Sequence, residues 1–294
     1  MSNERIGLIG TGLIGEPMGR NLREAGYPLT VHTRTKSRAD GLMAEGAAWA
    51  DTPADAARDA DVVISVVGDS PDVEAVYLGE NGVCQTLRAG CLAIDMSTVS
   101  PETARRVGTR VQACGAQFID APVSGGVNGA IAGKLSIMCG GEESDVQRAM
   151  PIFRALGETV VHCGPVGNGQ LTKLCNQILC GLNLLAVSEA LVFARRVGLD
   201  PGVMLQAVSA GAAGSWAVDH LGTRMVARDF EPMFMIDLQQ KDLRIALEIA
   251  RDAKVPLAGI SLVHQLLAAN QAQGEGREGT QALVKTLERM AGMP

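Results

Sequence analysis

The clearest signal of the fold in this 294-residue chain is the segment Ile6-Gly7-Leu8-Ile9-Gly10-Thr11-Gly12-Leu13-Ile14-Gly15. Its first four residues predict a strand, and the run from Pro17 to Ala25 that follows it predicts a helix. Glycines spaced as Gly-x-Gly-x-x-Gly between a strand and a helix are typical of a dinucleotide-binding turn. Gly10 permits the tight turn, Gly12 lets the backbone approach a pyrophosphate, and Gly15 lets the helix pack on the strand. The alternative is a glycine-rich turn without a ligand.

The rest of the chain falls into two halves. Up to about residue 163, apolar runs at 29–31, 61–67, 91–95 and 117–120 alternate with helical patterns at 36–45, 53–58 and 101–114. Strands that are apolar on both faces and alternate with helices predict a doubly wound α/β fold with a mainly parallel sheet. Beyond residue 168 only helical patterns remain, at about 169–196, 201–209, 215–226, 236–253, 257–272 and 279–291. We therefore expect an α/β domain over 1–164 and an all-helical domain over 165–294.

Composition narrows the class of protein. The net charge of −6 gives no global basic field, so we expect neither nucleic acid nor a membrane as a partner. The chain enters its first apolar run at once, without the pattern of a secretory leader, and we expect a cytoplasmic protein. Its seven cysteines are scattered without a Cys-x-x-Cys pair, and they predict reduced, mostly buried thiols. With only four histidines, none near two cysteines, we expect no metal site.

The end of the second predicted strand selects the nucleotide. Enzymes that use NAD usually carry Asp or Glu there to hold the ribose 2′-hydroxyl. Here the segment 31–38 holds no carboxylate and three cations. Arg34 can grip a 2′-phosphate with two hydrogen bonds, and Thr33 and Thr35 can donate to it. The segment favours NADP(H), with NAD(H) as the second possibility. The alternative is a solvent-exposed basic turn that binds no nucleotide.

Two further segments suggest a site for a small carboxylate. Ser124-Gly125-Gly126 follows the strand that ends at Asp120, and it offers a hydroxyl with backbone N–H groups that no side chain obstructs. Lys173 and Asn176 are three residues apart on a long, mostly apolar helix, so they share a face. Burial lowers the pKa of an ammonium group towards neutrality, as a general acid requires. Spacing alone leaves open whether Lys173 is catalytic or extends along the surface.

These motifs together resemble the β-hydroxyacid dehydrogenase family. The resemblance spans essentially the whole chain in five ordered segments: GLIGTGLIGEPMGRNL at 7–22, IDMSTVSP at 94–101, DAPVSGG at 120–126, GNGQLTKLCNQ at 167–177 and QKDL at 240–243. It implies a Rossmann domain, a long interdomain helix, an all-helical second domain and a homodimer or homotetramer. It also implies that Lys173 is the catalytic acid and base, and that Thr98 and Lys241 contact the cofactor. For Lys241 this role is implied by the resemblance only, because its spacing alone indicates a surface charge.

The resemblance and the motifs together give a full set of expected site residues. Those expected to bind the cofactor are Gly10, Thr11, Gly12, Leu13, Ile14, Gly15, Thr33, Arg34, Thr35, Val67, Thr98 and Lys241. Those expected to bind the substrate are Ser124, Gly125, Gly126, Asn176 and Trp216. The expected substrate is a small carboxylate-bearing aldehyde or the corresponding hydroxy acid.

Within the family, the segments 80–83, 187–191, 211–215 and 229–243 are most similar to tartronate semialdehyde reductases, which implies reduction of tartronate semialdehyde to D-glycerate. Trp216 departs from that pattern and resembles members that act on 3-hydroxyisobutyrate or serine. The alternatives are therefore a 3-hydroxyisobutyrate dehydrogenase or a reductase of succinic semialdehyde or glyoxylate. An imine reductase is disfavoured because such relatives generally lack the lysine, and a non-catalytic NADP-binding protein is the alternative from another class.

Overall fold

The computed structural model describes residues 4–293, and these divide into two compact units that meet between Lys173 and Leu174. The division falls within one helix, α8, which runs over Asn168–Arg196. Each unit is described by itself below.

The first unit is built on a six-stranded sheet with the order β3-β2-β1-β4-β5-β6, in which every neighbouring pair is parallel. Its strands are β1 (Ile6–Ile9), β2 (Leu29–His32), β3 (Ala48–Trp49), β4 (Val62–Ser65), β5 (Leu92–Asp95) and β6 (Gln117–Asp120). Strand order reverses direction beside β1, whose neighbours are β2 and β4, and ligands of open parallel sheets bind beyond the carboxyl ends of the strands at such a point. The predicted doubly wound sheet is confirmed.

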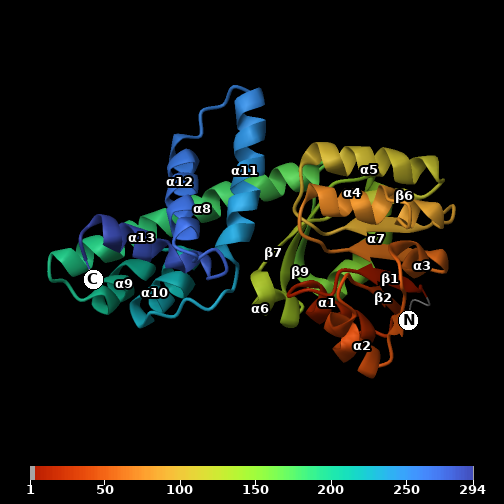
Figure 1. The fold of residues 1–294 in the computed structure, drawn as a ribbon, viewed down its shortest axis with the longest axis horizontal. Helices are drawn as coiled ribbons and strands as arrows, with labels where there is room; N and C mark the ends of the chain where they lie inside the picture. Colours follow the sequence, from red (N-terminus) through yellow and green to blue (C-terminus); the bar gives the residue numbers. More distant parts are fainter. Residues whose placement is uncertain (1–3, 294) are drawn as a thin grey trace. The chain divides into compact units, whose positions relative to one another are not determined.

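Alternate strand residues enter two separate cores, one on each face of the sheet. Leu8 and Ile64 point into one core and Ile9 and Val63 into the other, and all four side chains are at most 1% exposed. This is why the strands read as continuous apolar runs. The first core is covered by α1 (Gly15–Glu24), α2 (Asp40–Ala44), α6 (Gly126–Ile131) and α7 (Glu143–Leu156). The second is covered by α3 (Pro53–Arg58), α4 (Ser70–Leu78) and α5 (Pro101–Ala113) (Figure 1).

A second, three-stranded sheet extends this unit, and the sequence did not predict it. Its strands are β7 (Val123–Ser124), β8 (Leu135–Cys139) and β9 (Gly157–His162), and β7 runs antiparallel to β8. Two short 3₁₀ helices, η1 (Lys36–Ala39) and η2 (Val83–Gln85), complete the unit. The first replaces the opening turn of the helix predicted at 36–45.

The second unit is helical throughout, as predicted. Its elements are the rest of α8, α9 (Pro201–Ser209), η3 (Ala217–Gly222), α10 (Thr223–Ala227), α11 (Ile236–Asp252), α12 (Ala258–Ala272), η4 (Thr280–Ala282) and α13 (Leu283–Met290). The helix predicted at 215–226 is divided, because η3 is a π-helical segment that gives way to α10 at Thr223. The core of this unit gathers side chains from α8, α9, α11, α12 and α13.

One helix of the described residues, α8, is long and apolar enough to cross a membrane by length and composition alone. Half of its most apolar window is buried inside the protein, and Lys173 and Gln177 on it are buried as well. Buried polar groups on an apolar helix are typical of a core helix that carries a site. Its outer residues Leu171, Leu179, Leu182 and Phe193 remain exposed.

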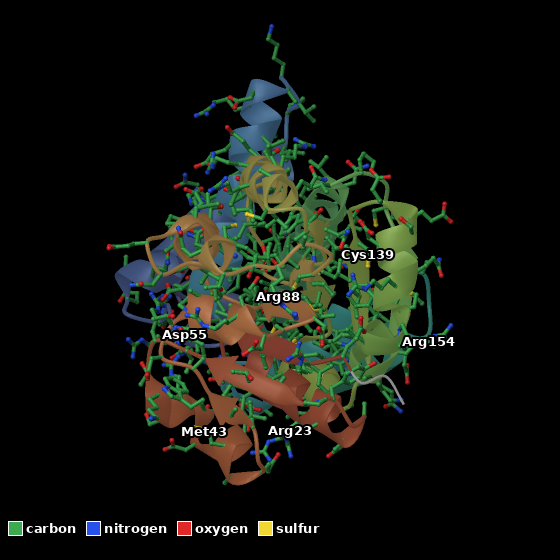
Figure 2. All side chains as sticks on the ribbon, turned by 90° about the vertical axis from the view of Figure 1, so that its right-hand side faces the viewer. Arg23, Met43, Asp55, Arg88, Cys139 and Arg154 are labelled. Carbon is green, nitrogen blue, oxygen red and sulfur yellow. The ribbon has the colours of Figure 1, made fainter. Side chains whose placement is uncertain are left out.

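The prediction of mostly buried thiols is wrong. All seven cysteines are free, but only Cys91 and Cys139 are buried, Cys139 inside β8 (Figure 2). Burial raises the pKa of the Cys139 thiol to about 12. Cys175 and Cys180 are exposed because they occupy α8 positions that the helical core leaves open. Composition alone does not indicate which side of a long helix faces the core.

Candidate active site

The turn after β1 has the geometry that its glycines predict. Gly10 has a φ of +98°, and a Cβ added there would lie 2.1 Å from the Val66 carbonyl oxygen. A Cβ on Gly15 would lie 1.9 Å from the Gly10 carbonyl oxygen, so the helix packs on the turn only with glycine at this position. A Cβ on Gly12 would meet no atom within 4 Å. The backbone at Gly12 therefore faces open space.

This turn fits the pyrophosphate of a dinucleotide. The residue before α1, Ile14, makes no side-chain cap, so the first N–H groups of the helix are not satisfied by a capping side chain. Thr11 is 2% exposed, and its buried hydroxyl has no hydrogen-bond partner in the protein. A helix N-terminus, a buried hydroxyl without a protein partner and a glycine that leaves room for a ligand are features that suit phosphate binding.

The end of β2 carries an exposed basic segment. The Arg34 side chain is 87% exposed and forms an ion pair with Asp72, 3.1 Å between Nη1 and Oδ1. Lys36 Nζ lies 5.0 Å from the centre of the Trp49 ring, which holds it on the same edge of the sheet. An exposed ion pair stabilises a protein by only about 0–1 kcal/mol, so Arg34 can exchange Asp72 for a phosphate at little cost.

The ends of β4 and β5 are joined by a buried polar network. The Ser65 and Ser97 hydroxyls both donate to Asp95 Oδ1, at 2.8 Å and 2.7 Å. Ser97 Oγ in turn accepts the Val67 N–H at 2.9 Å. The network joins the loop after β4, which carries Val67, to the loop after β5, which carries Thr98, and both residues are expected cofactor contacts.

The Ser124-Gly125-Gly126 segment forms a bend between β7 and α6. Gly125 and Gly126 have φ angles of +129° and +61°, conformations that other residues rarely adopt. Ser124 is half-buried and pairs with Ser136 of β8, whereas Gly125 is exposed. The segment thus presents its backbone on an open bend, as a carboxylate site requires.

The first turn of α8 is anchored to the ends of β5 and β6, and this anchoring was missed from the sequence. Asp120, at the end of β6, accepts the N–H groups of Gly167 and Gln170 at 2.7 Å and 2.8 Å. Gln170 Oε1 accepts the Val99 N–H at 3.0 Å, and Gln170 Nε2 donates to the Ser97 carbonyl at 2.8 Å. These bonds hold the start of the helix one turn before Lys173, which is 6% exposed.

Asp120 is itself an unusual carboxyl group. Burial raises its pKa to about 7, the hydrogen bonds from the Gly167 and Gln170 N–H groups lower it, and the neighbouring Asp95 adds to the rise. Asp95 and Asp120 are register partners on adjacent strands, so two carboxyl groups meet at this end of the sheet. Sequence inspection could have noted that both strands end in Asp.

In the second unit, polar side chains cross from α8 to α11. Asn176 Nδ2 donates to Gln177 Oε1 at 2.9 Å, and Gln177 Nε2 donates to Asp242 Oδ2 at 2.6 Å. Lys241 Nζ lies 2.9 Å from Asp242 Oδ1. The predicted residues Asn176 and Lys241 are therefore linked through Gln177 and Asp242, which sequence reasoning missed. Their only signal was polarity at positions that helical spacing assigns to a buried face.

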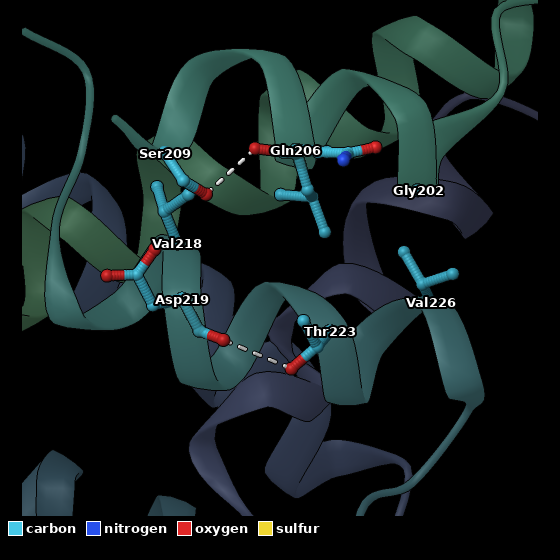
Figure 3. Close-up of a pocket in the computed structure, with 8 residues that line it drawn as sticks. Gly202, Gln206, Ser209, Val218, Asp219, Thr223 and Val226 are labelled. Atoms are coloured by element: carbon cyan, nitrogen blue, oxygen red, sulfur yellow. Dashed lines mark hydrogen bonds between the residues drawn. The ribbon is translucent and has the colours of Figure 1, made fainter. Parts of the chain in front are cut away.

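Trp216 is close in sequence to residues that line a cavity of the helical unit. Trp216 is 54% exposed and stacks on His220 at 4.6 Å between ring centres. The cavity, of about 320 Å³, is open and lies between α9, η3 and α10 (Figure 3). Its hydroxyls are engaged within the helices, since Ser209 donates to the Leu205 carbonyl and Thr223 to the Asp219 carbonyl. None of the predicted site residues lines it.

Comparison with known proteins decides the family. Residues 5–164 match the NAD-binding domain of 6-phosphogluconate dehydrogenase, and residues 167–287 match the NAD-binding domain of NADP-dependent 3-hydroxyisobutyrate dehydrogenase. The chain belongs to the β-hydroxyacid dehydrogenase family. It is 40% identical to 2-hydroxy-3-oxopropionate reductase of Escherichia coli (strain K12), over 98% of each chain. It is 42% identical to a probable 3-hydroxyisobutyrate dehydrogenase-like protein of Arabidopsis thaliana, over 98% of this chain and 86% of that one.

A solved structure agrees with this assignment. The 3-hydroxyisobutyrate dehydrogenase of Mycobacterium tuberculosis with L-serine is 31% identical and superposes with a TM-score of 0.89, over 97% of this chain and 99% of that one. The chain is thus an NAD(P)-binding oxidoreductase that acts on the CH–OH group of hydroxy acids. Among the described residues, no group of three or more His, Cys, Asp or Glu side chains is placed to hold a metal ion. The roles of the individual site residues stay predictions.

Proposed function

We propose that this protein reduces tartronate semialdehyde to D-glycerate, with NADPH as the preferred reductant and Lys173 as the general acid. The observation that carries the proposal is a buried ammonium group, 6% exposed, one turn into a helix whose start is anchored by Asp120 and Gln170. A charged group is costly to bury, and a lysine retained at a buried position is a candidate for proton transfer.

The bound nucleotide supplies a hydride to the aldehyde carbon. As negative charge develops on the carbonyl oxygen, Lys173 donates a proton to it, and in the reverse direction the neutral amine accepts the hydroxyl proton. A positioned acid of this kind accelerates a reaction by about 10²–10⁴-fold. Ser124, Gly125 and Gly126 hold the substrate carboxylate, and Asn176 contacts a further substrate oxygen from the same face of α8 as Lys173.

The choice of substrate rests on similarity to the Escherichia coli 2-hydroxy-3-oxopropionate reductase, which covers nearly the whole chain. Relatives named as 3-hydroxyisobutyrate dehydrogenases are similarly close, and Trp216 favours them. The choice of NADPH rests on Arg34 and on the absence of a carboxylate in the segment 32–38.

We also infer a homodimer or homotetramer. The apolar residues Leu171, Leu179, Leu182 and Phe193 follow one another at intervals of 8, 3 and 11 residues on α8, close to two, one and three helical turns, and all are exposed. Exposed apolar side chains gathered on one face of a helix are typical of an interface. Light scattering of the purified protein measures the mass of the assembly, and a monomer at micromolar concentration would overturn this part of the proposal.

The experiment that tests the function follows NADPH oxidation with four substrates: tartronate semialdehyde, methylmalonate semialdehyde, succinic semialdehyde and glyoxylate. We expect kcat/KM to be highest for tartronate semialdehyde, and higher with NADPH than with NADH. A higher value for methylmalonate semialdehyde would identify a 3-hydroxyisobutyrate dehydrogenase instead. No turnover with any of the four would contradict the proposed reaction.

A further inference from the structure

The hydrogen bonds between the polar side chains that join α8 to α11 have a defined donor and acceptor at each step, and this order determines the orientation of the Asn176 amide. Gln177 and Asp242 are 3% and 1% exposed, so neither can exchange its partner for water. Buried polar groups of this kind persist only when each finds a matching donor or acceptor.

Asp242 sets the order of donors and acceptors in these hydrogen bonds. An ionised carboxylate only accepts hydrogen bonds, so Gln177 must turn its NH₂ group towards Asp242 Oδ2, 2.6 Å away. The ammonium of Lys241, 2.9 Å from Oδ1, compensates the charge of the buried carboxylate. Adjacent helical residues do not face each other, so Lys241 bends back along α11 to make this ion pair.

The orientation of Gln177 then determines that of Asn176. With its nitrogen committed to Asp242, Gln177 presents Oε1 to Asn176, which answers with Nδ2 at 2.9 Å. The same Nδ2 donates to the Cys180 Sγ at 3.5 Å. Both N–H groups of this amide thus have partners on α8 itself, and its remaining polar atom is Oδ1, an acceptor.

We propose that Gln177 and Asp242 are positioning residues that hold Asn176 with its oxygen towards the substrate, and that they thereby favour substrates with a hydroxyl group beside the carbonyl carbon. The inference rests on the proposed function and deepens it. With its orientation fixed, Asn176 Oδ1 accepts a hydrogen bond from a substrate hydroxyl, and it is left without a partner when the substrate lacks that hydroxyl.

The test compares two substrates that differ only in that hydroxyl, tartronate semialdehyde and malonate semialdehyde. We expect the wild-type protein to prefer the first by roughly tenfold or more in kcat/KM, the value of one well-placed hydrogen bond. Gln177→Leu releases the amide of Asn176, and we expect this preference to fall by roughly tenfold through a higher KM, with kcat within roughly threefold of wild type.

Exchange of the two polar groups provides the rescue. In Gln177→Glu/Asp242→Asn the new carboxylate at 177 accepts from both amides, so Asn176 keeps its orientation, and we expect the preference to return to within roughly threefold of wild type. In Asp242→Asn alone, the single amide oxygen at position 242 cannot accept from both Gln177 and Lys241. We therefore expect this variant to behave like Gln177→Leu. The matched control is Gln240→Leu, the same substitution at a buried glutamine of α11 that bonds Gln271 at 3.0 Å outside this chain of contacts.

A second readout does not depend on turnover. Calorimetry of the protein without nucleotide, titrated with D-glycerate and with 3-hydroxypropionate, should show the same loss in Gln177→Leu and the same recovery in the exchange variant. An unchanged preference in Gln177→Leu, or an exchange variant that behaves like it, would overturn the inference. Equal use of both aldehydes by the wild type would also overturn it while leaving the reductase activity intact, whereas no reduction of any semialdehyde would refute the proposed function.

Discussion

The turn after β1 and the polar contacts between α8 and α11 show two ways of building a site. In the turn, backbone atoms form the site. Glycine is required there because a Cβ on Gly10 or Gly15 would lie within 2.1 Å of the carbonyl oxygen of Val66 or Gly10. Between the helices, side chains form the site, and Gln177 and Asp242 are 65 residues apart in the sequence. The first kind of site is local in sequence, and the second depends on how distant helices pack. Mutations should therefore affect the two regions differently.

The largest effect should come from the turn itself. Gly10→Ala introduces a Cβ 2.1 Å from the Val66 carbonyl oxygen at a φ of +98°, and we expect it to lower the free energy of unfolding. The strain and the overpacking together should amount to about 2–5 kcal/mol. Gly12→Ala meets no neighbouring atom, so we expect a change within about 0.5 kcal/mol in stability but weaker NADPH binding. Chemical denaturation and a fluorescence titration measure the two effects, and equal stabilities would show that the turn tolerates side chains.

The anchoring of α8 should appear as a dependence of stability on pH. The pKa of Asp120 is raised from 3.8 to about 7, so the native protein holds this proton more tightly than the unfolded chain does. Stability from this group is therefore present at low pH and is lost as pH rises through this range, by roughly 2 kcal/mol between pH 5 and 7. Asp120→Asn cannot titrate. The free energy of unfolding of the wild type should fall relative to this variant as pH rises, and a difference that is constant with pH would exclude the raised pKa.

A smaller effect should come from the exposed segment after β2. Arg34→Ala removes a group that can bind a 2′-phosphate, and we expect the Kd of NADPH to rise by about tenfold while that of NADH hardly changes. Arg38→Ala, an exposed arginine of the same segment, serves as the control. Equal losses for both nucleotides would mean that Arg34 does not recognise the phosphate.

The sequence predicted the features that are local. The strand–turn–helix unit at residues 6–24 and the buried strands 62–65 and 92–95 followed from apolar runs and glycine spacing, because neighbouring residues alone determine them. The small sheet of β7, β8 and β9 was not predicted, since its pairing joins residues 12 to 23 apart in the sequence, for example Ser124 with Ser136 and Cys139 with His162. Family resemblance singled out Lys241, but the contact that gives it a partner, Asp242, became visible only with the packing of α11.

The proposed reaction requires the buried ammonium of Lys173 to protonate the substrate. The most direct measurement is kcat for NADPH-dependent reduction of tartronate semialdehyde by Lys173→Ala, together with the Kd of NADPH for the same variant. Lys134→Ala, which removes an exposed lysine paired with Glu158, is the matched control. We expect a kcat lower by about 10²–10⁴-fold in Lys173→Ala, with a nearly unchanged Kd of NADPH, and a control that resembles the wild type. A kcat within a few-fold of wild type in Lys173→Ala would contradict this requirement.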